Sequence, residues 1–510
     1  MKFAKRMDRF GEGIFSKLAE IKKEKTAKGE EIIDLSIGAP NIPPAPHIME
    51  ALCRAAAEPS NYVYAISDRR EMLEAAGGWD KTRYAVELDP ETEICSLLGS
   101  QEGLAHIALS IVDEGDVVLV PDPCYPVFGD GPQIAGARLH YMPQRKENGY
   151  IIRLDEIPED VARKAKLMVV SYPNNPTTAM APDSFYEELI AFARKYDIIV
   201  LHDNAYSDLI FDGKACGSFL RFPGAKEIGV EFNSLSKTYG LAGARIGFCL
   251  GNSQVVSRLK LLKSNMDYGM FLPVQAAAIA AITGDQSCVQ ATRKAYETRR
   301  NIMCDGFTSI GWKMERPEAT MFVWAAIPEH YTSSEAFVME LVERAGVMVT
   351  PGSAFGPSGE GYVRLALVQD EEMLNKAIRA VRESGVLTAE GIRYMPDERN
   401  RPVLKRPALK RSVMNRPALN RWHVVILVYI CFIYGNSLTP ATISSQESGF
   451  LLDKFRGAMI SLGWEHLWLT EHIVRKTAHF AEYAVLGGLM VKACGGNGRY
   501  RIFNRDVLMM

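Results

Sequence analysis

The residues best suited to chemistry lie in one short segment, SLSKTYGLAGARIG, which runs from Ser234 to Gly247. Lys237 follows the end of an apolar stretch and is flanked by Ser234 and Ser236. A lysine at the rim of a buried sheet is partly desolvated, which favours its neutral amine, and such an amine can form a Schiff base with an aldehyde. The serine hydroxyls and the guanidinium of Arg245 suit a phosphate monoester. The segment therefore predicts a site for a phosphorylated aldehyde.

The elements that must position these residues lie between about residue 90 and residue 250. Continuous apolar runs recur there, and they predict strands buried on both faces of a parallel-type sheet covered by helices: EICSLLGS, DVVLVPDP, KLMVVSYPNNP, DIIVLHDNAY, GVEFNSLSK and RIGFCLG. One covering helix is expected over residues 183–195, with Asp183 as its N-cap. Ser100, Asn175 and Asp203 each follow one of these runs, as Lys237 does. Since ligands of open α/β sheets bind at the carboxyl ends of the strands, we expect these residues to share one rim.

Composition narrows the class of protein. The 510 residues are 47% hydrophobic and 24% charged, which is typical of a globular chain of several domains. Residues 1–390 carry a net charge of −11 and residues 391–510 one of +9, and an acidic body argues against nucleic acid as its partner. Nine scattered cysteines without a CxxC pair give neither a metal knuckle nor a disulfide framework, so we expect a reduced, cytosolic body without a metal. The N-terminal segment, MKFAKRMDRFGEG, has no apolar core, so we do not expect a signal peptide.

The four motifs SYPNNPT, HDNAY, SLSKTYGLAGARIG and YVRLAL, in this order, resemble the fold-type I aminotransferases of classes I and II over about residues 10–388. The run IGAPNIPPAPHIMEAL is most similar to the LL-diaminopimelate aminotransferase-like branch. The resemblance implies an α/β fold with a large domain, built on a mostly parallel sheet, and a smaller α+β domain. It also implies a homodimer that transfers an amino group from an L-amino acid to a 2-oxo acid by a ping-pong mechanism with pyridoxal 5′-phosphate. Diaminopimelate, alanine and aspartate are the expected donors, and 2-oxoglutarate or pyruvate the expected acceptor.

The resemblance assigns residues to the cofactor. Lys237 would form the Schiff base and move the Cα proton, and Asp203 would keep the pyridinium nitrogen protonated so that the ring acts as an electron sink. The remaining contacts would come from Tyr206 and Asn175 on the phenolic oxygen, Tyr125 on the ring face, and Ser100, Gln101, Ser234, Ser236 and Arg245 around the phosphate. Tyr64 matches a tyrosine that the family sends to the phosphate of the neighbouring subunit, although the family's glycine five residues later is Arg69 here.

The substrate would be held by a second, smaller set of residues. Arg364, in YVRLAL, would grip the α-carboxylate with a bidentate fork, with Asn175 beside it. Gly38 would let a backbone amide approach the same carboxylate. The same residues would serve a carbon–sulfur β-lyase of the cystathionine type, because the chemistry is shared up to the Cα carbanion, so that alternative stays open. We do not expect a transcriptional regulator, because the segment before IIDLSIGAP is short, and the complete residue set disfavours an inactive scaffold.

The chain is expected to divide into five parts. Residues 1–40 form an N-terminal arm and part of the small domain, residues 41–284 the large domain, and residues 285–390 the rest of the small domain. Residues 391–421 form a basic linker with Arg at every fifth position from 401 to 421 and repeated Pro, which suppresses helix and sheet. Residues 422–510 contain the apolar run VVILVYICFIY and the segment IVRKTAHFAEYAVLGGLM, which resembles part of a VanZ-like membrane domain. This short helical tail predicts that residues 422–493 tether a cytoplasmic enzyme to a membrane.

Overall fold

The computed structural model describes residues 3–10 and 14–388. The chain divides into two compact units, Met1–Tyr394 and Met395–Met510, and the first contains all the described residues. The expected linker over residues 391–421 and the VanZ-like segment over residues 422–510 lie outside the described residues. In the part of the chain that is described, no helix combines the length and apolar composition needed to cross a membrane.

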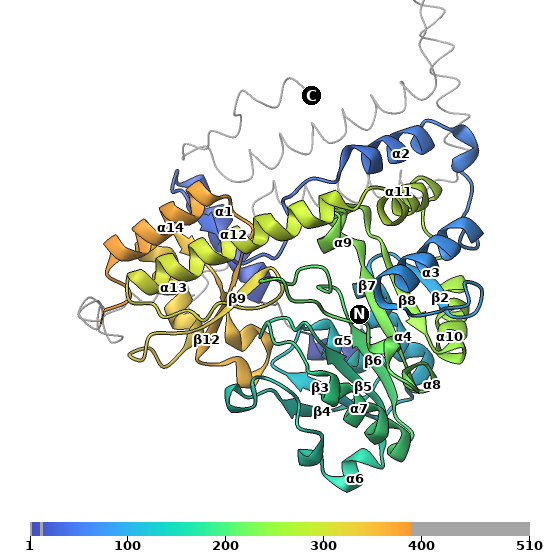
Figure 1. Cartoon of the computed structure of the whole chain (residues 1–510). Helices are drawn as coiled ribbons and strands as arrows, with labels where there is room; N and C mark the ends of the chain where they lie inside the picture. The colour runs from blue at the N-terminus through green and yellow to red at the C-terminus, as the bar shows by residue number, and fades with distance from the viewer. Residues whose placement is uncertain (1–2, 11–13, 389–510) are drawn as a thin grey trace, which may run out of the picture. The chain divides into compact units, whose positions relative to one another are not determined.

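A seven-stranded sheet forms the centre of the first unit (Figure 1). In spatial order its strands are β2 (Ile94–Leu97), β8 (Gly247–Gly251), β7 (Gly229–Ser234), β6 (Ile199–Asp203), β5 (Ala165–Ser171), β3 (Val117–Asp122) and β4 (Arg138–Pro143). The five strands from β7 to β4 run parallel, while β8 is antiparallel to both of its neighbours. The expectation of a mostly parallel sheet is confirmed, and the carboxyl ends of β5, β6 and β7 meet at one rim.

Helices cover both faces of this sheet because successive strand residues point to opposite sides. On one side, Met168 and Val170 pack with α2 (Pro46–Ala56), α3 (Arg70–Tyr84), α7 (Asp183–Tyr196) and α11 (Leu272–Thr283). On the other side, Leu167 and Val169 pack with α4 (Ser100–Ile111), α5 (Val127–Ile134) and α10 (Ser253–Ser264). Three single-turn helices connect strands: α6 (Glu159–Ala162), α8 (Ala225–Ile228) and α9 (Leu235–Thr238).

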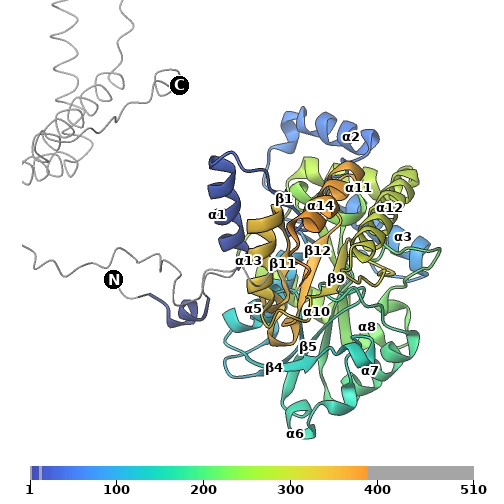
Figure 2. The same cartoon turned by 90° about the vertical axis from the view of Figure 1, so that its left-hand side faces the viewer.

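A second hydrophobic core joins the two ends of the described chain. It surrounds the antiparallel strands β11 (Thr350–Pro351), β12 (Tyr362–Ala366) and β9 (Phe322–Ala326), and a parallel pair, β1 (Ile33–Asp34) with β10 (Val347–Met348). The helices around it are α1 (Ile14–Ala27), α12 (Ser287–Ser309), α13 (Ser334–Ala345) and α14 (Glu371–Ser384). Figure 2 shows α1, α13 and α14 next to one another. Leu18, Ile33 and Leu35 share this core with residues beyond 296. The domain boundaries themselves stay a prediction.

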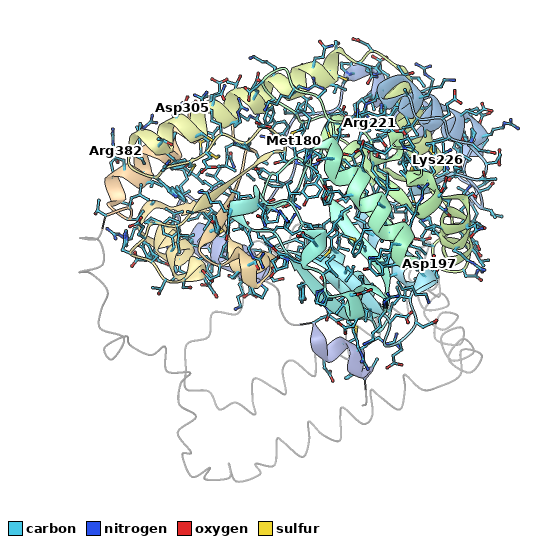
Figure 3. The ribbon with its side chains drawn as sticks, turned by 60° about the horizontal axis from the view of Figure 1, so that its bottom comes forward. Met180, Asp197, Arg221, Lys226, Asp305 and Arg382 are labelled. Atoms are coloured by element: carbon cyan, nitrogen blue, oxygen red, sulfur yellow. The ribbon has the colours of Figure 1, made fainter. Side chains whose placement is uncertain are left out.

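Two local features differ from the expectations. Strand β4 was not expected, because its residues RLHYMP lie at the sheet edge, where most of them are exposed or only partly buried, and lack a continuous apolar run. Helix α7 begins at Asp183 itself, so its N-cap is Pro182 and Asp183 is not the cap. The Asp183 carboxylate forms an ion pair with Arg221 instead. The residue that follows the helix, Asp197, adopts the left-handed conformation, and its side chain is exposed at the surface (Figure 3).

Candidate active site

Twelve of the thirteen predicted site residues line one cavity of about 450 Å³. They come from segments that lie far apart in the sequence: Gly38, Ser100, Gln101, Tyr125, Asn175, Asp203, Tyr206, Ser234, Ser236, Lys237, Arg245 and Arg364. Most of them follow the carboxyl ends of β2, β3, β5, β6 and β7, which is where a parallel sheet presents its ligand site. The shared rim inferred from the apolar runs is thus present in the fold.

The turn after β7 places Lys237 in this cavity. The strand ends at Ser234, whose Oγ accepts a hydrogen bond from the Ser236 N–H at 3.2 Å and caps the single turn of α9. The Lys237 Nζ donates to the Gly38 carbonyl oxygen at 3.0 Å. Burial, together with the nearby Arg364 and Arg245 guanidinium groups, lowers the pKa of Lys237 to about 8, although Asp203 opposes this shift. Near neutral pH the unprotonated, nucleophilic fraction of this amine is therefore much larger than that of an ordinary lysine.

Asp203 ends strand β6 beside this lysine, and its side chain is buried. Its Oδ1 has no hydrogen-bond partner among the residues described. Burial raises the pKa of Asp203 to about 6, while the charges of His202 and Lys237 lower it and that of Glu231 raises it further. A buried carboxylate oxygen without a donor is costly, so this position calls for a ligand that donates a hydrogen bond, such as a pyridinium N–H.

One corner of the cavity is suited to an anion. Helix α4 begins there at Ser100, and its first backbone N–H groups and its dipole favour negative charge. Gly99 has a φ of +82°, and a Cβ at this position would lie 2.2 Å from Nη2 of Arg245, so the glycine makes room for the guanidinium. The Tyr125 hydroxyl donates to Oε1 of Gln101 at 2.8 Å, which ties the loop after β3 to this helix start.

At the opposite end, Arg364 provides a buried positive charge from β12. Its Nη1 donates to Oδ1 of Asn175 and its Nη2 to the Ser36 carbonyl oxygen, both at 2.9 Å. Burial lowers the pKa of Arg364 to about 10, so the group stays charged at neutral pH. A glycine is needed at position 38, because a Cβ there would lie 2.6 Å from the ring of Phe322. The sequence did not show this steric reason.

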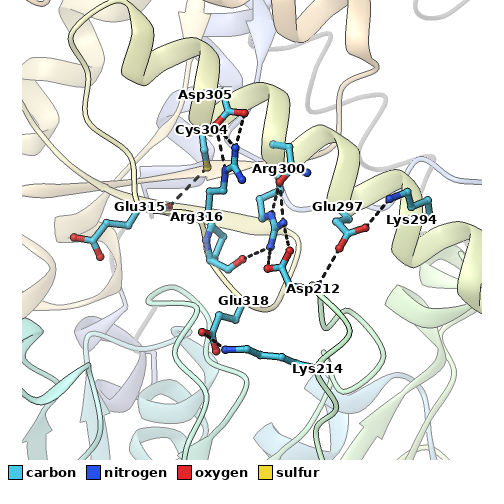
Figure 4. Close-up of polar contacts among 12 residues, drawn as sticks. Asp212, Lys214, Lys294, Glu297, Arg300, Cys304, Asp305, Glu315, Arg316 and Glu318 are labelled. Atoms are coloured by element: carbon cyan, nitrogen blue, oxygen red, sulfur yellow. Dashed lines mark hydrogen bonds and ion pairs between the residues drawn. The ribbon is translucent and has the colours of Figure 1, made fainter.

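The segment that carries Tyr206 is supported from the second core. Its continuation pairs with residues before β9, through the N–H of Phe211 donating to the Glu318 carbonyl oxygen at 2.9 Å. Arg300, buried on α12, holds the Asp212 carboxylate with two bonds of 2.6 and 2.8 Å and donates to the Pro317 carbonyl oxygen (Figure 4). Tyr206 itself packs edge-on against Phe322, with ring centroids 5.7 Å apart. This support gives Tyr206 a fixed position in the cavity wall.

Tyr64 is the one predicted residue that lies outside the cavity. Its side chain is 85% exposed, and its ring lies near that of Tyr268. The predicted role of Tyr64 in a neighbouring subunit stays a prediction.

Several apolar residues line the cavity without having been predicted: Ile37, Ala39, Pro40, Leu104, Ala205, Ala242 and Phe322.

Pyridoxal phosphate, the cofactor expected from the sequence, fits this donor set. Its ring nitrogen would supply the donor that Oδ1 of Asp203 lacks. Its phosphate would bind at the start of α4 and to Arg245, and its aldehyde would react with the Lys237 amine. Arg364 and Asn175 remain for a substrate carboxylate.

Comparisons with known proteins agree with this geometry. The model of the family described as aminotransferase class I and II matches residues 30–381. The LL-diaminopimelate aminotransferases of Moorella thermoacetica and Syntrophobacter fumaroxidans are 44% and 45% identical to the chain, over 75% and 72% of its length and 98% and 95% of theirs. Among solved structures, substrate-bound BacF from Bacillus subtilis is similar with a TM-score of 0.73 at 35% identity, covering 75% of this chain and 98% of that one. A probable N-succinyldiaminopimelate aminotransferase from Thermus thermophilus gives a TM-score of 0.69 at 37% identity, covering 73% of this chain and all of that one.

Proposed function

Because the chain belongs to the class I and II aminotransferases, we propose that its amino donor is LL-diaminopimelate and its acceptor 2-oxoglutarate or pyruvate. The enzyme is a pyridoxal-phosphate-dependent aminotransferase that acts on an amino acid and a 2-oxo acid. The carbon–sulfur β-lyase alternative is not favoured, since the relatives described above are aminotransferases. The observation that carries the choice of donor is the identity of 44% over nearly the whole length of a relative that bears this name.

We propose that the cavity residues divide the work as the sequence motifs suggested. When bound, pyridoxal phosphate withdraws electrons from the Cα–H bond of the substrate. Lys237 would hold its aldehyde carbon, and the Nζ that is freed by an incoming amino group would take the Cα proton. A pKa of about 8 suits this Nζ to both accepting and returning a proton near neutral pH. Asp203 would hold a proton on the ring nitrogen, and Tyr206 and Asn175 would hydrogen-bond to the ring oxygen.

The substrate carboxylate would be held at the other end of the cavity. Arg364 stays charged there, and the bonds to Asn175 and Ser36 fix the direction of its fork. Gly38 lines the same cavity, and its backbone N–H would bind the same carboxylate. One cavity serves the donor and the acceptor in turn, which is the arrangement that a ping-pong cycle requires.

The donor is tested by steady-state assays of the purified full-length protein. LL-diaminopimelate, alanine, aspartate and cystathionine are each supplied with 2-oxoglutarate, and glutamate is quantified. We expect kcat/KM for LL-diaminopimelate to exceed that of the other donors by at least about tenfold. A Lys237→Met variant, assayed in parallel, gives the background. A preference for another donor would refute the substrate proposal, and release of pyruvate and sulfur compounds from cystathionine would move the reaction to the lyase.

We further propose that two copies of the chain form a homodimer in which Tyr64 reaches the phosphate corner of its partner. An exposed apolar group around Tyr64 supports this proposal: the exposed fractions of Tyr62, Val63, Tyr64 and Ile66 are 64%, 63%, 85% and 75%. Exposed apolar patches of this kind mark interaction surfaces.

For the tail, we propose that residues 422–493 tether the enzyme to a membrane and leave the catalytic part in the cytoplasm. The run VVILVYICFIY and the basic residues that precede it support the proposal.

A further inference from the structure

Two aromatic rings lie against the guanidinium of Arg364. Its Cζ lies 4.2 Å from the ring centroid of Phe322 and 4.6 Å from that of Phe355. Contacts of this kind stabilise a cation over an aromatic face, and two of them restrict the tilt of the guanidinium plane. Asn175 and Ser36 accept its hydrogen bonds and so restrict its rotation within that plane. Phe322 lines the cavity, whereas Phe355 lies outside the set of cavity-lining residues.

The position of Phe355 is set by a connection to the loop that follows β3. Phe355 ends a short 3₁₀ turn, and its carbonyl oxygen accepts a hydrogen bond from the Cys124 N–H at 2.8 Å. Three residues later, Ser358 donates to the Asp122 carboxylate from its Oγ at 2.7 Å and from its N–H at 3.2 Å. Gly356 allows this approach, since its φ is +127° and a Cβ there would lie 2.1 Å from Oδ1 of Asp122.

The Asp122 carboxylate is buried, with 6% of the residue exposed. In the described part of the chain, its side-chain hydrogen bonds come from the N–H and O–H of Ser358. The strand that ends at Asp122 leads directly to Tyr125, which lines the cavity. The Asp122–Ser358 pair therefore links the loop that carries a predicted cofactor contact to the turn that covers one face of Arg364.

We propose that Phe355 and the Asp122–Ser358 pair are positioning residues for Arg364, which hold its guanidinium plane at the angle that receives the substrate α-carboxylate edge-on. This inference rests on the proposed role of Arg364 as the carboxylate-binding residue. Loss of the Ser358 hydroxyl releases the turn, and loss of the Phe355 ring frees one face of the guanidinium. Both changes weaken binding of a carboxylate more than they change the proton transfer at Lys237, because neither touches the Lys237 side of the cavity.

The test compares Ser358→Ala with Ser353→Ala in the full-length holoenzyme. Both serines are exposed in the same segment, but the Ser353 hydroxyl contacts Ser334 rather than Asp122. We expect Ser358→Ala to raise KM for the best amino donor about five- to tenfold with kcat within about twofold, as the loss of a charge-assisted hydrogen bond would cause. Ser353→Ala should change neither parameter by more than about twofold, Ser358→Thr should restore KM, and Phe355→Leu should act like Ser358→Ala.

A binding measurement without turnover gives the second readout. The dissociation constant of 2-methylalanine, which has an α-carboxylate but no Cα proton, should rise with KM, while the affinity of the protein for pyridoxal phosphate stays unchanged. If Arg364→Lys leaves KM unchanged, the proposed role of Arg364 is wrong. If Arg364→Lys raises KM while Ser358→Ala and Phe355→Leu do not, the positioning inference alone is wrong. Equal losses in kcat and cofactor affinity in Ser358→Ala, with a lowered melting temperature, would also overturn it by indicating a general structural role.

Discussion

Replacing Lys237 with Met should stabilise the cofactor-free protein at neutral pH while it abolishes transamination. The lysine is held beside two guanidinium groups and away from bulk water, which lowers its pKa from 10.5 to about 8. A difference of this size corresponds to about 3 kcal/mol of unfavourable free energy for the charged amine in the folded state. Met has a similar length and no charge, so the substitution removes this cost and keeps most of the packing.

The pH dependence gives this prediction its sign. The unfolded chain binds the Lys237 proton more tightly than the folded chain does, so the cost is fully present below about pH 8 and disappears as the pH rises to 10.5. The free energy of unfolding of the Met variant should therefore exceed that of the unsubstituted protein by about 3 kcal/mol at pH 7 but by only about 1 kcal/mol at pH 9.5. With an unfolding entropy of about 2.1 cal/mol/K for each residue of the unit Met1–Tyr394, these gains correspond to melting temperatures higher by roughly 4 °C and 1 °C.

The assay is a thermal melt of the cofactor-free full-length proteins at both pH values. Lys23→Met serves as the control, since this lysine is exposed on α1 and its replacement should change the melting temperature by less than about 1 °C. The electrostatic reasoning would be refuted if the rise in melting temperature were as large at pH 9.5 as at pH 7. A lower melting temperature of the Met variant at pH 7 would refute it as well. Turnover by Lys237→Met would remove the lysine from the reaction altogether.

Three further predictions concern the cofactor, the subunits and the tail. Asp203→Asn keeps the size of the side chain but removes its charge, so the affinity for pyridoxal phosphate in equilibrium dialysis should fall at least about tenfold, and an unchanged affinity would contradict the pairing with the ring nitrogen. Tyr64→Phe should lower the same affinity by a similar factor without changing the mass measured by solution scattering, whereas a fully active monomer would contradict the proposed dimer. The full chain should sediment with membranes, and ending it at residue 390 should release an active enzyme into the supernatant; recovery of the full chain there without detergent would reject the tether.

Local sequence patterns predicted the buried strands and the polar residues at their ends, but not the elements that surround the site. Buried strands such as β5 and β6 are recognisable in the sequence by their continuous apolar runs. Polar groups at the carboxyl ends of such strands lie at the same edge of the sheet, so the position of the site could be predicted without knowledge of the rest of the fold. The edge strand β4 lacks such a run and was missed. Asp183 is not the cap because the helix already begins at this residue.

Contacts between distant segments were beyond the reach of these patterns. The Asp122–Ser358 bond joins residues 236 positions apart, and neither side chain belongs to a recognisable motif. Only the folded chain places the ring of Phe322 against Gly38 and Arg364. Sequence reasoning therefore identified the groups that do chemistry more completely than the groups that hold them in place.

The bond between Arg364 and the Ser36 carbonyl oxygen spans 328 positions, and this separation sets an order of events during synthesis. At about 5–20 residues per second, a ribosome needs roughly 20 to 60 s to extend the chain from Ser36 to Arg364. The segments that carry Asp203 and Lys237 precede Gly251, the last residue of β8. They are therefore synthesised well before β12. A nascent chain thus acquires the groups for its cofactor first, and its N-terminal segment must wait for β10 and β12 before the carboxylate-binding end can close.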